Sequence, residues 1–215
     1  MPNNAKIAII GSGNVGGTLG RRWAQSGHTV LFSSRHPESG QIKKLVADSG
    51  PTAGAAIVAD AVRRSDVVLL ATPWPATQAA VAEAGDLTGK ILIDATNPLL
   101  PDLSGLEVGT TTSGAETVAG WARGARVVKA FNSIGANIMA NPDMGGQPAV
   151  LFYCGDDEPA KRVVHDLGAQ LGFDAEDAGP LTQARVLEPF ALLWVSLAFT
   201  RGYGREFAFR IVRRG

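Results

Sequence analysis

Residues 6–16 decide the fold, and they read KIAIIGSGNVG. The first five form a short apolar run, typical of a buried parallel strand. A glycine-rich turn follows at once, and a helix pattern begins inside it, because Val15, Leu19 and Trp23 recur on one helical face. A second apolar run at 29–32 completes a unit of strand, glycine turn, helix and strand. Such a unit is typical of a dinucleotide-binding Rossmann fold.

The glycine turn predicts phosphate binding. Gly11 permits the tight turn, Gly13 lets a pyrophosphate approach the backbone, and Gly16 lets the helix pack on the strand. Free N–H groups at the helix start, together with the positive end of its dipole, face the phosphates. A glycine turn without a ligand is the alternative, which the strand before it and the helix after it disfavour. The predicted cofactor-binding residues of the turn are Gly11, Ser12, Gly13, Asn14, Val15 and Gly16.

The end of the second strand indicates which dinucleotide binds. NAD enzymes usually carry Asp or Glu there, about 20 residues beyond the glycines, to hold the ribose 2′-hydroxyl. This chain instead reads Ser33, Ser34, Arg35 and His36, with no acid before Glu38. A carboxylate would repel a 2′-phosphate, whereas an arginine binds it through two charge-assisted hydrogen bonds. We therefore predict NADP(H) at these four residues; a solvated loop cation is the alternative role for Arg35.

Further apolar runs separated by helical patterns predict an α/β fold. We expect a Rossmann-type doubly wound, mostly parallel sheet with a small C-terminal helical subdomain. The predicted domains are 1–180 for NADP binding and 181–215 for dimerisation and the acceptor site. The remaining predicted strands lie near 55–58 and at 66–71, 91–95, 126–130, 150–154 and 173–176, with helices at 158–171 and from Thr182.

Residues at the carboxyl ends of the predicted strands are polar but uncharged, interleaved with aromatic residues and prolines. Ligands bind beyond these ends in doubly wound sheets. We predict that Thr72, Pro73 and Trp74 contact the cofactor, although turn chemistry for the proline and core packing for the tryptophan remain alternatives. The candidates for lining the hydride-transfer site are Trp74, Asn97, Asn132 and Ser133. None is an evident acid or base, so we assign no certain catalytic residue and expect hydride transfer by positioning onto a flavin-type ring.

Composition and charge exclude several classes of partner. Lys and Arg number 20, as do Asp and Glu, so no basic excess favours nucleic acid. One cysteine and three scattered histidines predict neither a disulfide framework nor a metal site. The apolar run at 190–199 is about half the length of a membrane span, and no signal-peptide core precedes the first strand, so we expect a soluble cytoplasmic protein. We expect this run to pack one face on the sheet domain and another on a second subunit or a flat apolar ligand.

Several motifs resemble a known family. Those at 11–16, 33–35, 72–74, 154–157 and 177–181 are similar to the NADP oxidoreductases that use the deazaflavin coenzyme F420. The resemblance implies a homodimer that exchanges hydride between NADPH and the deazaflavin. By position, it also implies that Ser12, Asn14, Ser34 and Arg35 hold NADP and that Trp74 lies near the cofactor.

One segment departs from that pattern and leaves the acceptor open. Residues 129–132 look more like the cytosolic NADPH-oxidising domain of the six-transmembrane metalloreductases, which pass hydride to an ordinary flavin. F420, FMN and FAD are therefore all candidate acceptors. Two other functions stay open: an imine reductase of pyrroline-carboxylate reductase type, and a non-catalytic NADP(H)-binding sensor. The first requires a long helical dimerisation domain, for which the residues after the predicted strand at 126–130 are few.

Overall fold

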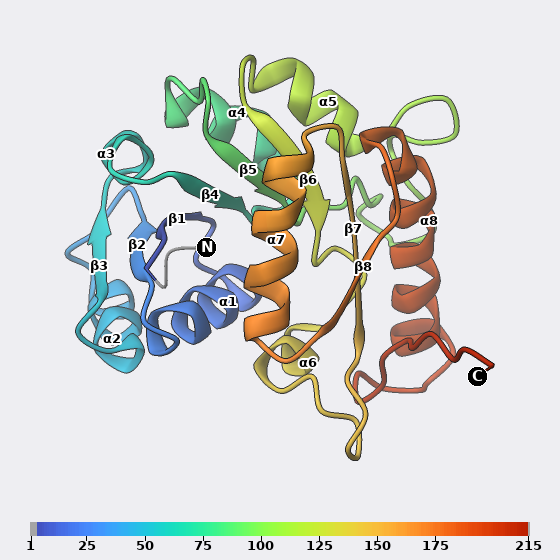
Figure 1. Ribbon diagram of the computed structural model, residues 1–215. Coiled ribbons are helices and arrows are strands. Elements are labelled where there is room, and N and C mark those ends of the chain that lie inside the picture. The colour runs from blue at the N-terminus through green and yellow to red at the C-terminus, as the bar shows by residue number, and fades with distance from the viewer. Residues whose placement is uncertain (1–3, 215) are drawn as a thin grey trace.

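The protein is described by a computed structural model over residues 4–214, and its centre is a single eight-stranded sheet (Figure 1). The strand order is β3-β2-β1-β4-β5-β6-β7-β8. Neighbouring strands are parallel except for β6 and β7, which are antiparallel. The strands are β1 Lys6–Ile10, β2 Thr29–Ser33, β3 Ala53–Ala56, β4 Val67–Leu70, β5 Ile91–Asp94, β6 Arg126–Ala130, β7 Val150–Gly155 and β8 Asp174–Asp177.

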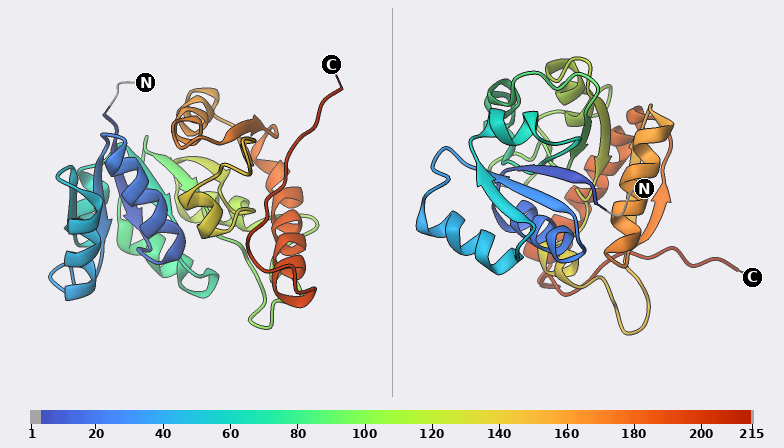
Figure 2. Two further views of the ribbon diagram at one scale, coloured as in Figure 1. Left: turned by 90° about the horizontal axis from the view of Figure 1, so that it is seen from below. Right: turned by 60° about the vertical axis from the view of Figure 1, so that its left-hand side comes forward.

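Helices cover both faces of this sheet (Figure 2). Along β1, Ile7 and Ile9 point into one apolar core, and Ala8 and Ile10 point into the other, as the alternation of a strand requires. The helices of the first face are α1 Asn14–Gln25, α2 Gly40–Ser49, α6 Ala136–Ala140 and α7 Glu158–Gln170. Those of the second face are α3 Val58–Arg63, α4 Trp74–Ala84, α5 Gly114–Trp121 and α8 Ala184–Val195.

The predicted α/β doubly wound architecture is confirmed, with small shifts at element ends. The strand expected near 55–58 lies at 53–56, because Val58 already begins α3. The helix expected from Thr182 begins at Ala184, after the 3-10 turn Leu181–Gln183. A π-helical turn, Ser196–Thr200, continues α8.

Two contacts are predicted for the apolar run at 190–199, and within one chain only the packing of one face on the sheet domain is seen. Ala191 and Trp194 are buried, whereas Leu193 is 48% and Phe199 58% exposed. One side of α8 therefore packs on the sheet domain and the other faces outward. No helix in the described part of the chain is long and apolar enough to cross a membrane.

The sheet topology fixes where a ligand can bind. The chain winds outward from β1 through β2 to β3, then returns past β1 to β4 and continues in the opposite direction. The carboxyl ends of β1 and β4 therefore form a switch point, where loops diverge and leave a crevice. Because β7 runs antiparallel to β6, its carboxyl end at Gly155 pairs with Val128, away from the crevice edge.

The predicted boundary at 180/181 falls between β8 and the 3-10 turn. Ala184 and Leu187 beyond it join the same apolar core as β4 and β5. The division into two domains therefore stays a prediction. The outermost residues of the two predicted domains, 1–3 and 215, lie outside the part of the chain that the structure describes.

Candidate dinucleotide-binding crevice

The glycine turn joins β1 to α1, and its glycines serve different purposes. Gly11 has φ +95°, and a Cβ there would lie 2.5 Å from the carbonyl oxygen of Ala71. A Cβ on Gly16 would collide with the carbonyl oxygen of Gly11. A Cβ on Gly13 would meet no atom within 4 Å, yet Gly13 precedes an α1 N-terminus that no side chain caps. The fold therefore requires Gly11 and Gly16, while the space at Gly13 is open to a ligand.

The end of β2 forms another part of the candidate site, beside the glycine turn. The Ser12 hydroxyl donates to the Ser33 carbonyl oxygen at 3.3 Å, which ties the glycine turn to this strand end. The backbone N–H of His36 donates to the Ser34 hydroxyl at 3.0 Å and shapes the turn that presents Arg35. Arg35 is exposed and makes no ion pair within residues 4–214.

A cavity of about 360 Å³ lies between this strand end and α4. Gly11, Ser33, Ser34, Arg35 and Thr72 line it, so five predicted cofactor-binding residues meet in one place. His36 is exposed next to the cavity and is not among its lining residues. The carboxylate-bearing Glu83 of α4 also lines it, a residue that the sequence analysis missed.

The switch-point crevice has a volume of about 490 Å³. The predicted residues Gly13, Asn14, Val15, Thr72, Pro73, Trp74 and Asn97 line it, together with Ala71, Pro75, Ala95, Thr96, Leu99, Leu100, Pro101 and Leu103. None of these lining residues is ionisable. The three leucines were missed by the sequence analysis; the apolar stretch at residues 98–101, which follows Thr96 and Asn97, was the signal that could have found Leu99 and Leu100.

Trp74 begins α4 and is only 8% exposed. Its ring stacks on that of Trp121, with ring centroids 5.6 Å apart and planes inclined by 28°. Trp74 thus reaches the crevice wall while most of its surface is packed in the core. Core packing, the alternative weighed from the sequence, accounts for most of its contacts.

Asn97, Asn132 and Ser133 do not all line the crevice. Asn97 does, and its amide donates to the carbonyl oxygen of Asn132 at 2.7 Å. The Asn132 amide donates to Asn97 Oδ1 at 3.1 Å and to the carbonyl oxygen of Leu187 in α8 at 3.0 Å. Asn132 and Ser133 are buried and absent from the crevice wall. Asn132 therefore supports Asn97 through these hydrogen bonds without lining the crevice itself.

A buried ion cluster lies beside this amide pair. Lys129 Nζ donates to Asp94 Oδ2 at 3.0 Å and to the Thr96 carbonyl oxygen at 2.6 Å, and it pairs with Glu188 Oε1 at 2.8 Å. All three ionic side chains are fully buried. Burial works to lower the pKa of Lys129, but the two carboxylates outweigh it, so its pKa is raised. Lys129 thus pairs with two buried carboxylates, which favour its charged form, and cannot serve as a base.

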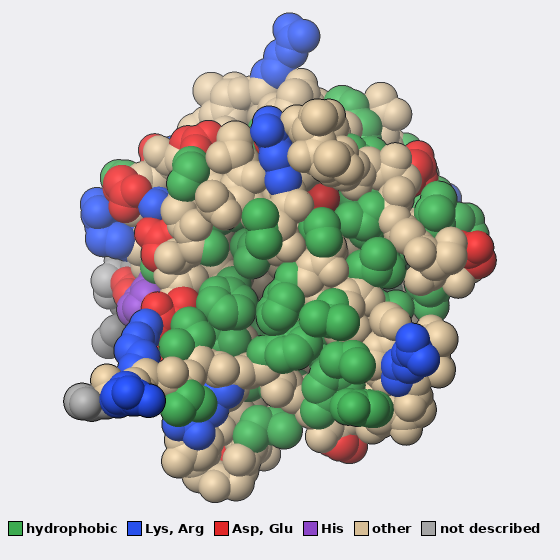
Figure 3. Space-filling model, turned by 90° about the vertical axis from the view of Figure 1, so that its right-hand side faces the viewer, with side chains coloured by type: hydrophobic (Ala, Val, Ile, Leu, Met, Phe, Trp, Pro, Cys, Tyr) green, Lys and Arg blue, Asp and Glu red, His purple; other side chains and the backbone are tan. Residues whose placement is uncertain are grey.

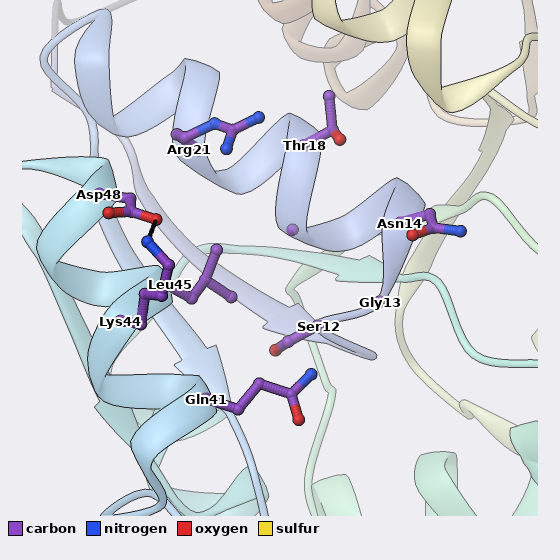
Figure 4. Close-up of a pocket in the computed structure, with 10 residues that line it drawn as sticks. Ser12, Gly13, Asn14, Thr18, Arg21, Gln41, Lys44, Leu45 and Asp48 are labelled. Carbon is purple, nitrogen blue, oxygen red and sulfur yellow. Dashed lines mark hydrogen bonds and ion pairs between the residues drawn. The ribbon is translucent and has the colours of Figure 1, made fainter.

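A third depression, a groove of about 310 Å³, lies between α1 and α2 (Figure 4). Ser12, Gly13 and Asn14 form the end that it shares with the glycine turn. Lys44 pairs with Asp48 at 2.9 Å, and Arg21 is the other cationic side chain among the lining residues. Asn14 points away from the groove in Figure 4. We find no set of catalytic side chains in it.

The strand order, the glycine turn and the crevice at the switch point together define a Rossmann-type dinucleotide-binding protein. A family model described as NADP oxidoreductase coenzyme F420-dependent matches residues 6–98. A solved structure from Arthrobacter sp. FB24, provisionally assigned as an F420-dependent NADP reductase, is 32% identical, with a TM-score of 0.87, and covers 97% of this chain and 100% of that one. The chain belongs to this family of F420-dependent NADP oxidoreductases.

Two curated relatives extend the comparison. The F420-dependent NADP reductase of Methanocaldococcus jannaschii is 29% identical over 89% of this chain and 92% of the relative. The metalloreductase STEAP3 of Rattus norvegicus is 32% identical over 89% of this chain, but the chain spans only 38% of its length. Both families that the sequence motifs resemble are therefore found as relatives.

A likeness to imine reductases is limited to the fold. A reductive aminase from Aspergillus terreus, solved with NADPH, superimposes with a TM-score of 0.67 at 22% identity. It matches 93% of this chain and 63% of that one.

Proposed function

We propose that the protein is an NADPH-dependent oxidoreductase that transfers a hydride between NADP(H) and a flavin-type ring, with F420, FMN and FAD as the candidates. The observation that carries the proposal is the switch-point crevice, which begins at the open glycine turn and is lined by no ionisable side chain. Family membership supports the NADP part of the proposal.

The proposed cofactor placement follows the two cavities and the turn between them. The 2′-phosphate would lie at Arg35, with Ser34 beside it and His36 near the rim. The pyrophosphate would cross Gly13, where the open space and the uncapped α1 N-terminus favour an anion. The nicotinamide would enter the crevice, where Asn97 offers a side-chain amide.

The crevice chemistry favours a ring acceptor over an imine. NADPH supplies the hydride, and a flavin-type ring accepts it with the negative charge spread over its pyrimidine, so no acid is needed at the reacting atom. An imine nitrogen needs a proton during reduction. The nearby Lys129 holds its protons in three internal contacts and is fully buried. The residues that line the crevice would then act by binding, orienting and excluding water.

The outward side of α8 supports a homodimer as part of the proposal. Figure 3 shows hydrophobic side chains gathered on the face of the molecule that carries α8. Val186, Leu193 and Phe199 are all large, apolar and exposed there. Monomers seldom leave such a group uncovered.

Oxidation of NADPH, followed at 340 nm with F420, FMN, FAD, riboflavin and a small cyclic imine in parallel, tests the proposal. We expect turnover with at least one ring and none with the imine. Turnover with the imine alone would identify an imine reductase. Tight NADPH binding without oxidation by any of these acceptors would identify a binding module instead.

A further inference from the structure

The ion cluster around Lys129 joins three separate segments of the chain. Asp94 is the last residue of β5, Lys129 lies opposite it in β6, and Glu188 comes from α8. An ammonium group has three hydrogens to donate, and here Asp94, Glu188 and the Thr96 carbonyl oxygen take all of them. Because all three N–H donors of Lys129 are taken, none is left for a substrate. Any effect of Lys129 on the site must therefore pass through its partners.

On the crevice side, the partners of Lys129 hold the turn that follows β5. Asp94 Oδ1 accepts from the Thr96 N–H at 2.9 Å and from the Thr96 hydroxyl at 2.7 Å. Lys129 binds the carbonyl oxygen of the same residue at 2.6 Å. The N–H, hydroxyl and carbonyl of Thr96 are therefore all fixed by the cluster, and Thr96 and Asn97 line the crevice.

On the opposite side, the cluster anchors α8. Glu188 accepts from the backbone N–H groups of Gly114 and Ala115 at 2.8 and 3.0 Å, at the start of α5. The neighbouring residue of α8, Leu187, accepts the amide of Asn132, which also binds Asn97. Two adjacent residues of α8 are thus connected to the crevice. Glu188 connects through Lys129 to Thr96, and Leu187 connects through Asn132 to Asn97.

We propose that Lys129 and Glu188 are positioning residues, which couple α8 to the Thr96–Asn97 turn and so set the nicotinamide half of the crevice. The inference rests on the proposed function, because it assigns the nicotinamide to that crevice. The adenosine half, at Arg35, shares no residue with this network. Loss of the network should therefore weaken binding of one half of the cofactor and spare the other.

The test compares two ligands in titrations of the full chain. NADPH occupies both halves of the site, whereas 2′,5′-ADP occupies only the adenosine half. For Glu188→Gln, which keeps the shape of the side chain, we expect about a tenfold loss of NADPH affinity, because a small displacement at a positioned ring is costly. Binding of 2′,5′-ADP should stay within about twofold of the parent protein. Lys129→Met should show the same selective loss, measured only if its near-ultraviolet circular dichroism matches that of the parent.

The matched control is Arg185→Met. Arg185 also joins α8 to α5, through Glu116 at 2.6 and 2.9 Å, but it contacts neither Thr96 nor Asn97. We expect it to change the affinity of neither ligand. Equal losses of both ligands in Glu188→Gln, or no loss of either, would overturn the coupling while leaving the NADP site intact. Failure of the parent protein to bind either ligand would instead refute the proposed function.

Discussion

The indole of Trp74 stacks on the indole of Trp121 at a centroid separation of 5.6 Å, where α4 and α5 meet. Trp74 also forms part of the crevice wall. A residue that the motif places beside a cofactor thus contributes mainly to the packing of two helices. Its substitution should therefore affect stability more than ligand binding.

We expect Trp74→Ala to lower the free energy of unfolding by about 3–5 kcal/mol, the usual cost of truncating a buried tryptophan. Urea denaturation would measure the loss. Trp74→Phe keeps an aromatic ring against Trp121 and should leave NADPH affinity within about twofold. A large loss of NADPH affinity in the phenylalanine variant would show that Trp74 contacts the cofactor directly.

Two glycines of the turn should respond differently to alanine. Gly16→Ala would place a methyl group against the Gly11 carbonyl oxygen, so we expect a loss of about 1–3 kcal/mol of stability. Gly13→Ala meets no protein atom within 4 Å and should fold normally, yet its methyl group would occupy the path of the pyrophosphate. Thermal unfolding and NADPH titration of both variants would check this contrast. Undiminished NADPH binding by Gly13→Ala would show that the turn does not bind the pyrophosphate.

Arg35 should select the phosphorylated cofactor. We expect Arg35→Ala to raise the Michaelis constant for NADPH at least about tenfold, since a charge-assisted bidentate contact is lost, and to leave the use of NADH nearly unchanged. Arg123→Ala, at another exposed arginine, is the matched control and should alter neither constant. Equal losses with NADPH and NADH would exclude Arg35 from the 2′-phosphate site.

The single cysteine should be chemically silent in the folded protein. Burial raises the pKa of Cys154 to about 12, so its thiol stays protonated at pH 8. Compared with a free cysteine, we expect the thiolate fraction at pH 8, and with it the rate of reaction with a disulfide reagent, to fall about 10³-fold. Addition of guanidinium should restore the ordinary rate. The thiol of the unfolded chain ionises at a lower pH than the buried thiol of the folded protein. The contribution of the protonated thiol to folding stability is therefore lost as the pH rises from about 8.5 to about 12.

The exposed side of α8 should control the oligomeric state. We expect the parent protein to elute as a dimer in light-scattering chromatography and Leu193→Glu to elute as a monomer, because a buried carboxylate without a partner is costly at an interface. Met144→Glu places the same charge on an exposed apolar residue outside α8 and should remain dimeric. Elution of the parent protein as a monomer would contradict the homodimer and leave the exposed side of α8 free for another partner.

The sequence by itself determined the first half of the site. A strand, a glycine turn and a helix are local features, whose residues lie next to one another in the chain, so their geometry follows from backbone conformation and amphipathic periodicity. The order of strand ends along a parallel sheet also predicted the positions of Thr72 and Asn97 at the crevice. The exclusion of acid–base side chains there depended only on residue type.

Only the tertiary structure decided the contacts that join distant segments. The packing of Trp74 on Trp121, the support of Asn97 by Asn132, and the saturation of Lys129 by Asp94 and Glu188 all link positions 35 or more residues apart. No periodicity records such pairs, because they depend on how strands and helices stack across the sheet. The antiparallel β7, which turns residues 154–157 away from the crevice, is the same kind of fact: an apolar run specifies a strand but not its direction.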